Sequence, residues 1–216
     1  VTYLERARVT EISGARVQFA YEGQTREVLA DRIVGADGRS SIVRKSLGGP
    51  TEAEVISHMA GVELNDVEVP FEGFGHVLLG GPGPVLLYRI APGRVRACLD
   101  IEVGAPGARR DASYLWEAFA PRFPAALRPA LRKALRSQRL TWACNRFLPR
   151  AFYGEGRAAL VGDAVGFYHP LTASGISIGL RDAEALVRSN DVASYQSERE
   201  AASYVPELLA NALYQV

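Results

Sequence analysis

Alternating apolar and polar residues predict short β-strands in the first and middle parts of the chain. Near the N-terminus, Gly14 and Gly23 separate these runs as hairpin turns do. A second β-rich region extends from about residue 55 to residue 104, where turns rich in glycine and proline separate the runs. The predicted strands are residues 7–12, 16–21, 26–30, 32–36, 76–79, 85–90 and 94–103.

A four-residue spacing of leucines predicts helical structure in residues 111–137. Leu127, Leu131 and Leu135 share one helical face, and the prolines at positions 121, 124 and 129 are expected to divide the segment into two helices. The mixture of β-rich and helical regions predicts an α/β fold. The later predicted elements are strands at 140–148 and 157–161, a helix at 175–188, and one or two helices, broken near Pro206, at 191–216.

Composition changes this picture little. The chain has 216 residues, 48% of them hydrophobic and 23% charged, and a formal net charge of +1, which is ordinary for a globular protein. Basic residues are spread along the chain, so we expect no nucleic-acid partner. Cys98 and Cys144 fit no metal spacing, and neither do His58 and His76, so no metal site is predicted.

Targeting and membrane-spanning segments would indicate where the protein resides. The sequence shows no signal peptide and no apolar stretch close to the roughly 18 residues of a membrane span. We expect a cytoplasmic, reduced protein, and peripheral membrane association stays open. The first residues favour a strand without an initiating Met, and residues 206–216 stop in a helical pattern without a C-terminal signal. We therefore expect a piece of a longer or processed polypeptide.

The strongest chemical signal lies in residues 157–187, RAALVGDAVGFYHPLTASGISIGLRDAEALV. A short apolar strand is expected to deliver Gly162 and Asp163 at its carboxyl end, where open α/β sheets bind ligands. Small residues then lead into the predicted helix, whose first N–H groups and dipole favour an anion or a polarised carbonyl. This order predicts a cradle for a polar, partly anionic cofactor. In the alternative, Asp163 only caps the next segment and the small residues form a tight turn.

Residues 162–176, GDAVGFYHPLTASGI, resemble the GD motif of the flavoprotein hydroxylases, which are FAD-dependent monooxygenases, and are most similar to the squalene epoxidase family. Ala173 and Ser174 stand where that family has glycines. His169, before a proline, is interpreted as structural. The matching residues are Gly162, Asp163, Ala164, His169, Pro170, Leu171, Thr172 and Gly175.

This resemblance implies an FAD site. Asp163 would bind the ribityl hydroxyls, residues 170–176 would pass the isoalloxazine ring, and the helix starting near Gly175 would point its N–H groups at the pyrimidine edge. No residue is predicted to be catalytic, because the oxidant belongs to the cofactor. The cofactor-binding residues expected in this segment are Gly162, Asp163, Pro170, Gly175 and Ile176.

A second segment, residues 35–44 (GADGRSSIVR), resembles the DG motif of the same superfamily. An Asp-Gly turn opens a short helix, with Arg44 one turn later to pair with a carboxylate or phosphate. The resemblance implies that Asp37, Gly38 and Arg44 lie near the FAD pyrophosphate and serve FAD and NAD(P)H binding, and that Val9 touches the adenine side. The alternative is an ordinary surface turn.

The family's glycine-rich G-x-G-x-x-G motif after a strand is not in this sequence. GEGRAA, residues 154–159, is similar but precedes a strand, so it is expected to form a hairpin or entry loop. We therefore expect the later part of an FAD/NAD(P)-binding, Rossmann-like domain with an inserted β-sheet and helix substrate module. The expected divisions are residues 1–50 (DG part of the FAD-binding domain), 51–150 (substrate module), 151–190 (GD part of the FAD-binding domain) and 191–216 (C-terminal helices).

The resemblance implies an FAD-dependent monooxygenase that uses NAD(P)H and O₂ to epoxidise or hydroxylate a small apolar substrate, with isoprenoids among the candidates. Two other functions stay open. One is a flavin-dependent isoprenoid reductase or oxidase on the same scaffold, since the cofactor motifs are shared. The other is a truncated, non-catalytic relative that binds a partner or lipid, which the missing glycine-rich motif favours.

Overall fold

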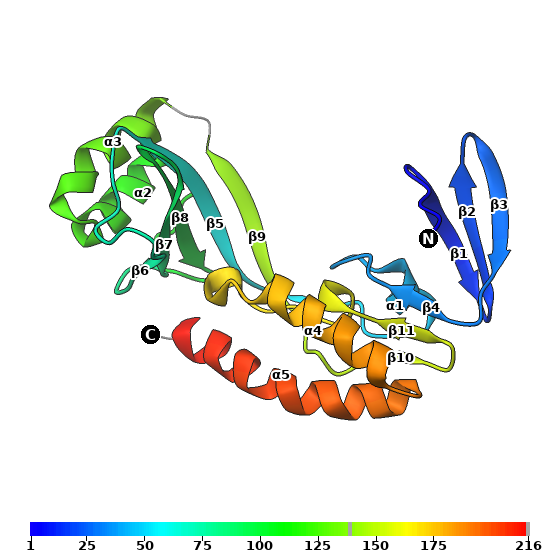
Figure 1. Ribbon diagram of the computed structural model, residues 1–216. Coiled ribbons are helices and arrows are strands. Elements are labelled where there is room, and N and C mark those ends of the chain that lie inside the picture. The colour runs from blue at the N-terminus through cyan, green and yellow to red at the C-terminus, as the bar shows by residue number, and fades with distance from the viewer. Residues whose placement is uncertain (138–139, 215–216) are drawn as a thin grey trace. The chain divides into compact units, whose positions relative to one another are not determined.

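The computed structural model describes residues 1–137 and 140–214, and the chain divides into two compact units. Unit 1 contains Val1–Glu54 and Phe147–Ala210, and unit 2 contains Val55–Arg146 together with the C-terminal residues from Asn211. Figure 1 labels the elements of both units.

Unit 2 is built on a five-stranded sheet with the strand order β6-β7-β8-β5-β9. Helices α2 and α3 cover one face of this sheet (Figure 1), and their apolar residues form one core with the sheet residues that point toward them. Alternate residues of β5, such as Ala60, Val62 and Leu64, are fully buried in this core. The elements are β5 (Glu54–Asn65), β6 (His76–Leu78), β7 (Val85–Ala91), β8 (Arg94–Glu102), α2 (Ala112–Phe119), α3 (Arg128–Ser137) and β9 (Thr141–Phe147).

The predicted division of residues 111–137 by prolines is confirmed. Helix α2, whose N-terminus is capped by Asp111, ends at Phe119, and two 3₁₀ turns, Ala120–Arg122 and Ala125–Leu127, separate it from α3. The three leucines predicted to share a face are 3%, 0% and 5% exposed, so the helical pattern identified the core face correctly. The long strand β5 was expected only as part of a β-rich region, because its apolar alternation is interrupted.

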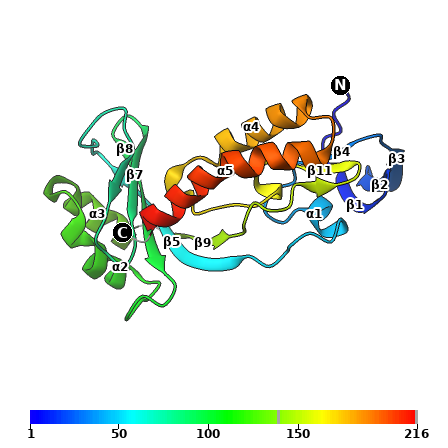
Figure 2. The ribbon, with the colours of Figure 1, turned by 90° about the horizontal axis from the view of Figure 1, so that it is seen from below.

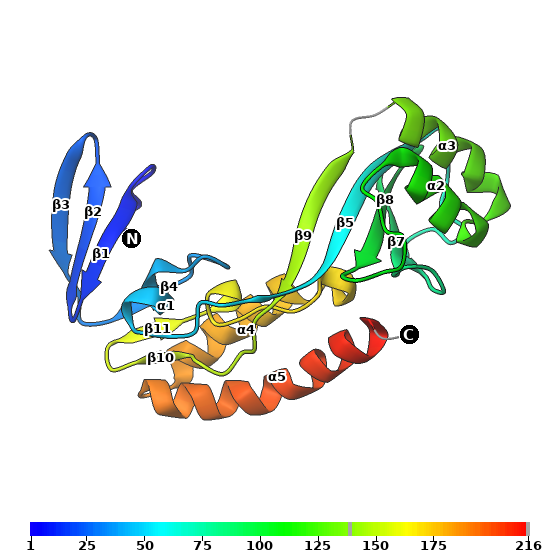
Figure 3. The ribbon, with the colours of Figure 1, turned by 180° about the vertical axis from the view of Figure 1, so that it is seen from behind.

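Unit 1 begins with an antiparallel three-stranded sheet, as the spacing of Gly14 and Gly23 predicted. Both glycines have positive φ angles (59° and 75°), which the hairpin turns require. Figure 3 shows this sheet from the opposite side to Figure 1. Its strands are β1 (Arg8–Ser13), β2 (Arg16–Tyr21) and β3 (Gln24–Leu29).

A second small sheet of unit 1, with the order β10-β11-β4, positions both sequence motifs. Strand β11 (Ala158–Leu160) runs parallel to β4 (Ile33–Gly35), with Leu160 opposite Gly35, so both strands end at the same sheet edge. Strand β10 (Gly154–Glu155) pairs antiparallel with β11, which confirms that GEGRAA forms a hairpin. The parallel pair therefore places the DG turn and the GD turn side by side.

Helix α4 (Gly175–Arg188) has the predicted bounds, and α5 (Val192–Tyr214) runs alongside it (Figure 2). The expected break near Pro206 was wrong, because α5 is one helix with Pro206 inside it. A proline costs the hydrogen bond to the carbonyl four residues earlier, but α5 buries Tyr195 and Ser203 before this point and Ala210 after it. Packing on both sides outweighs the local loss. In the described part of the chain, none of the helices combines the length and apolarity needed to cross a membrane.

Candidate functional site

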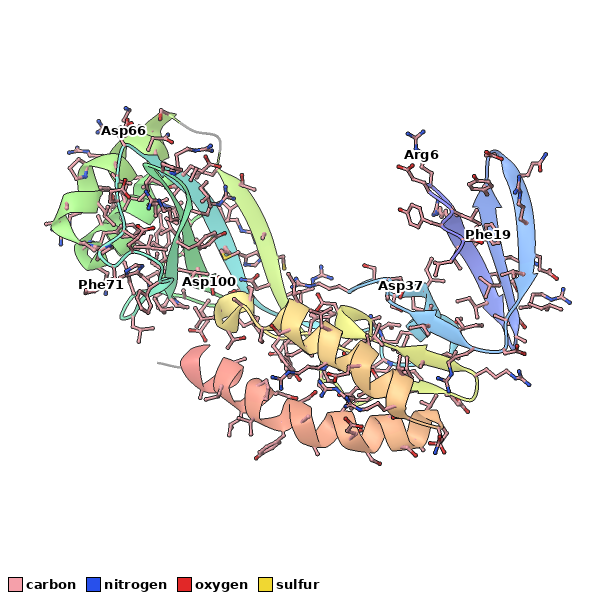
Figure 4. The ribbon with its side chains drawn as sticks, in the orientation of Figure 1. Arg6, Phe19, Asp37, Asp66, Phe71 and Asp100 are labelled. Atoms are coloured by element: carbon pink, nitrogen blue, oxygen red, sulfur yellow. The ribbon has the colours of Figure 1, made fainter. Side chains whose placement is uncertain are left out.

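The DG turn is held by its own aspartate and glycines. The carboxylate of Asp37, labelled in Figure 4, accepts hydrogen bonds from the backbone N–H groups of Ile42 (2.6 Å) and Val43 (3.3 Å), at the start of α1 (Ile42–Ser46). Gly38 has a φ of 74°, which favours glycine. A Cβ added at Gly35 would lie 2.7 Å from Val43 Cβ, so strand and helix meet too closely for any side chain there.

Arg44 was predicted to pair with a carboxylate or phosphate, but among the described residues its guanidinium binds backbone carbonyls. Its side chain is 1% exposed, and its guanidinium donates to the backbone carbonyls of Arg39 (2.6 Å), Pro50 (2.8 Å) and Ala164 (2.6 Å). Burial lowers the pKa of Arg44, and the nearby charge of Asp37 opposes that effect. The DG arginine therefore joins the DG turn to the GD turn from inside the protein, since a buried guanidinium needs acceptors for its donors.

The GD turn follows β11 as a short 3₁₀ turn, Gly162–Ala164. Gly162 has a φ of 62°, and its N–H donates to the carboxylate of Asp182 on α4 at 2.8 Å. A Cβ added at Gly179 would lie 3.4 Å from Gly162 Cα, so α4 crosses the turn closely. A Cβ at Gly166 would lie 2.6 Å from two backbone carbonyl oxygens. Glycine is therefore required where the turn meets its neighbours.

Asp163 reaches across to the DG motif. Its Oδ2 accepts a hydrogen bond from Arg39 Nε at 3.1 Å, and the guanidinium of Arg39 lies 5.1 Å from the centre of the Phe167 ring. The segments that follow are not capped by Asp163: the His169 side chain caps the turn Pro170–Thr172, and α4 has no side-chain cap, contrary to the alternative interpretation. Both charged side chains are about two-fifths exposed (45% and 38%), so solvent screens the pair and the carboxylate remains accessible to a ligand.

A cavity of about 190 Å³ lies beside this pair, within unit 1. It is bounded by Arg39 of the DG motif, by the GD turn and the loop that follows it, and by the first turn of α4. The lining residues are Arg39, Arg150, Asp163, Gly166, Phe167, Tyr168, His169, Pro170, Thr172, Ala173, Ser174, Gly175, Ile176 and Ile178.

The loop before α4 is shaped by two local features. His169 is buried, and its Nδ1 accepts a hydrogen bond from Leu171 N (3.2 Å) to cap the 3₁₀ turn Pro170–Thr172, in agreement with a structural role. Ala173 adopts the left-handed conformation (φ 49°), which costs an alanine about 1 kcal/mol relative to glycine. Ala173 and Ser174 occupy the two positions where the family has glycines, and of these Ala173 has the left-handed conformation that glycine adopts most easily.

The first turn of α4 is open toward the cavity. Ser174 precedes the helix and makes no side-chain cap hydrogen bond, while its hydroxyl lies 2.8 Å from the Thr172 hydroxyl. An added Cβ at Gly175 would meet only Asp163 Oδ1, at 3.9 Å. The helix start therefore leaves backbone donors and space beside the Asp163 carboxylate.

A buried ionic network supports the GD turn from behind. Asp182 (0% exposed) accepts hydrogen bonds from Arg150 Nη2 and from Arg199 Nε (2.8 Å). Burial lowers the pKa of Arg150, but the interactions with Asp182, Tyr153 and Tyr168 together outweigh burial, so the pKa is raised. Burial also raises the pKa of Tyr168, whose hydroxyl has no hydrogen-bond partner in the described part of the chain. The network fixes α4 against the turn.

The structure brings most of the predicted GD residues together. Asp163, Pro170, Gly175 and Ile176 line the cavity, and Gly162 begins the turn that carries Asp163. Asp37 and Gly38 shape the adjacent turn. Val9 lies on β1 opposite Phe19 and is not among the residues described as lining the cavity.

Two lining arginines were missed. Arg39 lies inside the DG match, at a position where that motif specifies no residue, so its place in the motif was the available signal. Arg150 lies outside both motifs, and no local pattern marks it.

The residues present fit the ribityl and ring end of FAD. The cavity combines one accessible carboxylate with an uncapped helix start and with Arg150, whose buried Nε has no hydrogen-bond partner in the described residues. A carboxylate suits hydroxyl donors, and a helix N-terminus suits the electron-rich edge of a flavin. Residues 1–137 and 140–214 contain no group of three or more His, Cys, Asp or Glu side chains placed to hold a metal ion.

Comparison with known proteins identifies the family of this chain. A family model described as squalene epoxidase matches residues 29–216. Squalene epoxidase ERG1 of Candida albicans is 32% identical over 178 residues, and squalene monooxygenase of Rattus norvegicus is 30% identical over 220 residues. These alignments cover 80% and 95% of this chain, which spans only 36% and 38% of the length of the two relatives.

Solved structures share the fold at lower identity. PqsL of Pseudomonas aeruginosa, a probable FAD-dependent monooxygenase, is 21% identical with a TM-score of 0.76, over 96% of this chain and 62% of PqsL. HpxO of Klebsiella pneumoniae, solved with FAD and uric acid, is 22% identical with a TM-score of 0.63, over 90% of this chain and 53% of HpxO. The predicted α/β fold of the FAD-dependent monooxygenases is confirmed, and the chain belongs to the squalene epoxidase family.

Proposed function

We propose that this chain forms the flavin-ring wall of the FAD site in an FAD-dependent monooxygenase that uses O₂ and NAD(P)H. The observation that carries this proposal is the position of Asp163 beside the uncapped first turn of α4, in one cavity. Such a carboxylate accepts hydrogen bonds from sugar-alcohol hydroxyls, while the helix start favours negative charge on a ring. Membership of the squalene epoxidase family supports the same cofactor.

Each residue has a defined task in this proposal. Bound FAD supplies the electron transfer and oxygen activation, and the protein orients it and excludes water. Asp163 holds the ribityl chain, with Arg39 fixing the carboxylate. Pro170 and Ile176 shield the ring side, and Gly175 leaves room for it. Asp37 and Gly38 keep the DG turn close to the pyrophosphate end, where Val9 would meet the adenine side.

Unit 2 is proposed to bind the apolar substrate. Because successive strand residues point to opposite faces, Met59 and Tyr88 lie on the sheet face away from α2 and α3. Their partners across the strands are Asp100 and Arg96. This face mixes large apolar and polar side chains, as a site for a mostly apolar molecule with one reacting position does.

We also propose a cytoplasmic location with peripheral membrane contact. The support is the exposed apolar surface of α5, where Tyr204, Val205, Leu208 and Leu209 are each at least half exposed. Apolar side chains that would otherwise face water can insert into the boundary between lipid headgroups and acyl chains.

Oxygen uptake tests the proposed reaction. The whole protein that carries this chain, supplied with FAD, NADPH or NADH and dispersed squalene as the probe, is expected to consume one O₂ for each oxygenated product. The measurement pairs an oxygen electrode with product analysis, and reactions without squalene serve as the control. Reduction of the probe without oxygen uptake would instead identify a reductase, and a protein that takes up no flavin would identify a non-catalytic relative.

A further inference from the structure

Two buried arginines hold the backbone of the GD turn, and only one of them lines the cavity. Arg44 binds the turn from the side of the DG motif. Arg150 binds it from the other side, where its Nη1 donates to the carbonyls of Gly162 (2.8 Å) and Gly166 (3.1 Å). Arg150 is 5% exposed, yet it belongs to the cavity lining. It therefore contacts both the turn and the space that the turn bounds.

Arg150 shares its buried counter-ion with a second arginine. Arg150 and Arg199 share the single carboxylate of Asp182, and all three are at least nine-tenths buried. Glu207 also interacts electrostatically with Arg150, and burial raises the pKa of this carboxyl. Two guanidinium groups therefore bond directly to one carboxylate behind the GD turn.

The cavity lining likewise holds more arginines than carboxylates. Its charged members are Arg39, Arg150 and Asp163, and Arg39 already pairs with Asp163. Arg150 is thus the lining cation whose carboxylate partner, Asp182, lies outside the lining and is shared with Arg199. Because Arg150 is buried, its charge is screened less than a charge at the surface.

We propose that Arg150 is a positioning residue that holds the GD turn and also raises the reduction potential of FAD bound there. The inference rests on the proposed function. Hydride transfer from NAD(P)H gives the flavin two electrons and one proton, which adds one negative charge. A fixed positive charge favours that anionic form over the oxidised form. By binding the carbonyls of Gly162 and Gly166, Arg150 also fixes the backbone on both sides of Asp163 and so the direction of its side chain.

Three variants of the whole protein separate charge from packing. Arg150→Met removes the charge, Arg150→Lys keeps the charge without the planar fork, and Arg188→Met is the matched control on the exposed side of α4. The measured quantity is the ratio of the dissociation constants for reduced and oxidised FAD, obtained from the midpoint potential in dye equilibration.

Arg150→Met is expected to raise this ratio about tenfold, which lowers the potential of a two-electron couple by about 30 mV. Arg150→Lys should keep the ratio within about threefold of the wild type, while the protein binds both oxidised and reduced FAD more weakly. Should Arg150→Met fail to fold, Arg150→Gln, which retains an amide donor, is expected to show the same rise. A ratio in the neutral variant equal to that of Arg188→Met would overturn the inference.

Failure of the inference is distinguishable from failure of the proposed function. Wild-type protein that binds FAD, together with an unchanged ratio in the neutral variants, contradicts only the role of Arg150. Wild-type protein that takes up no FAD contradicts the proposed function, and the inference falls with it.

Discussion

Replacing Arg44 with methionine is expected to lower the free energy of unfolding by about 3–5 kcal/mol. The methionine keeps most of the side-chain volume but leaves the carbonyls of Arg39, Pro50 and Ala164 without their buried donors. Each unsatisfied buried carbonyl costs about 1–3 kcal/mol, and partial entry of water relieves some of that cost. Urea unfolding followed by circular dichroism measures the change.

The neighbouring Lys45→Met serves as the control, because Lys45 is exposed and its loss should change stability by about 0.5 kcal/mol or less. Arg44→Lys should fall between the two, since an ammonium cannot reach three separated carbonyls at once. If Arg44→Met unfolds like the wild type but loses affinity for the FAD pyrophosphate, Arg44 binds the phosphate after all, and the structural role assigned to it is wrong.

The Asp182→Asn variant should be destabilised by a similar amount, about 3–5 kcal/mol. The amide keeps the shape of the carboxylate but removes the negative charge that Arg150 and Arg199 share, and it replaces one acceptor oxygen with an NH2 donor. Two buried guanidinium groups then lack a counter-ion. Thermal unfolding by calorimetry measures the loss, and the GD turn is expected to exchange its amide hydrogens faster, because Gly162 N–H also binds Asp182.

Glu184→Gln is the matched control for Asp182→Asn. Glu184 lies on the same helix and pairs with Arg188 at the surface, where an ion pair contributes at most about 1 kcal/mol. Equal effects of the two substitutions would show that the buried network contributes no more than a surface pair, contrary to the geometry described for it.

Local signals in the sequence were strong enough to place most elements. The glycines at hairpin turns and the four-residue leucine spacing act within a few residues, so the β1–β3 sheet and the buried face of α3 were predictable. Helix α5 was not, because burial at Tyr195 and Ala210 depends on tertiary contacts that outweigh the cost of Pro206. Propensity arguments do not include that packing.

In the candidate site, too, features set by local sequence were predictable and features set by tertiary contacts were not. Asp163 and the small-residue loop were predictable, because a GD turn after a buried strand follows a local pattern. The buried contacts of Arg44 were not predictable, because a motif gives the residue but not whether its guanidinium faces a ligand or the interior. Arg150 and Asp182 come together across 32 residues, and no spacing in the sequence encodes that contact.

The central claim, that Asp163 and the start of α4 form one wall of an FAD site, is tested most directly by titrating the whole protein with FAD. Flavin fluorescence is followed for the wild type, for Asp163→Ala and for Asp31→Ala, whose aspartate lies in an exposed pair with Arg157. Loss of hydrogen bonds to a charged acceptor should weaken FAD binding roughly 10- to 100-fold in Asp163→Ala, while Asp31→Ala binds like the wild type. Equal FAD affinity of all three proteins would contradict the claim.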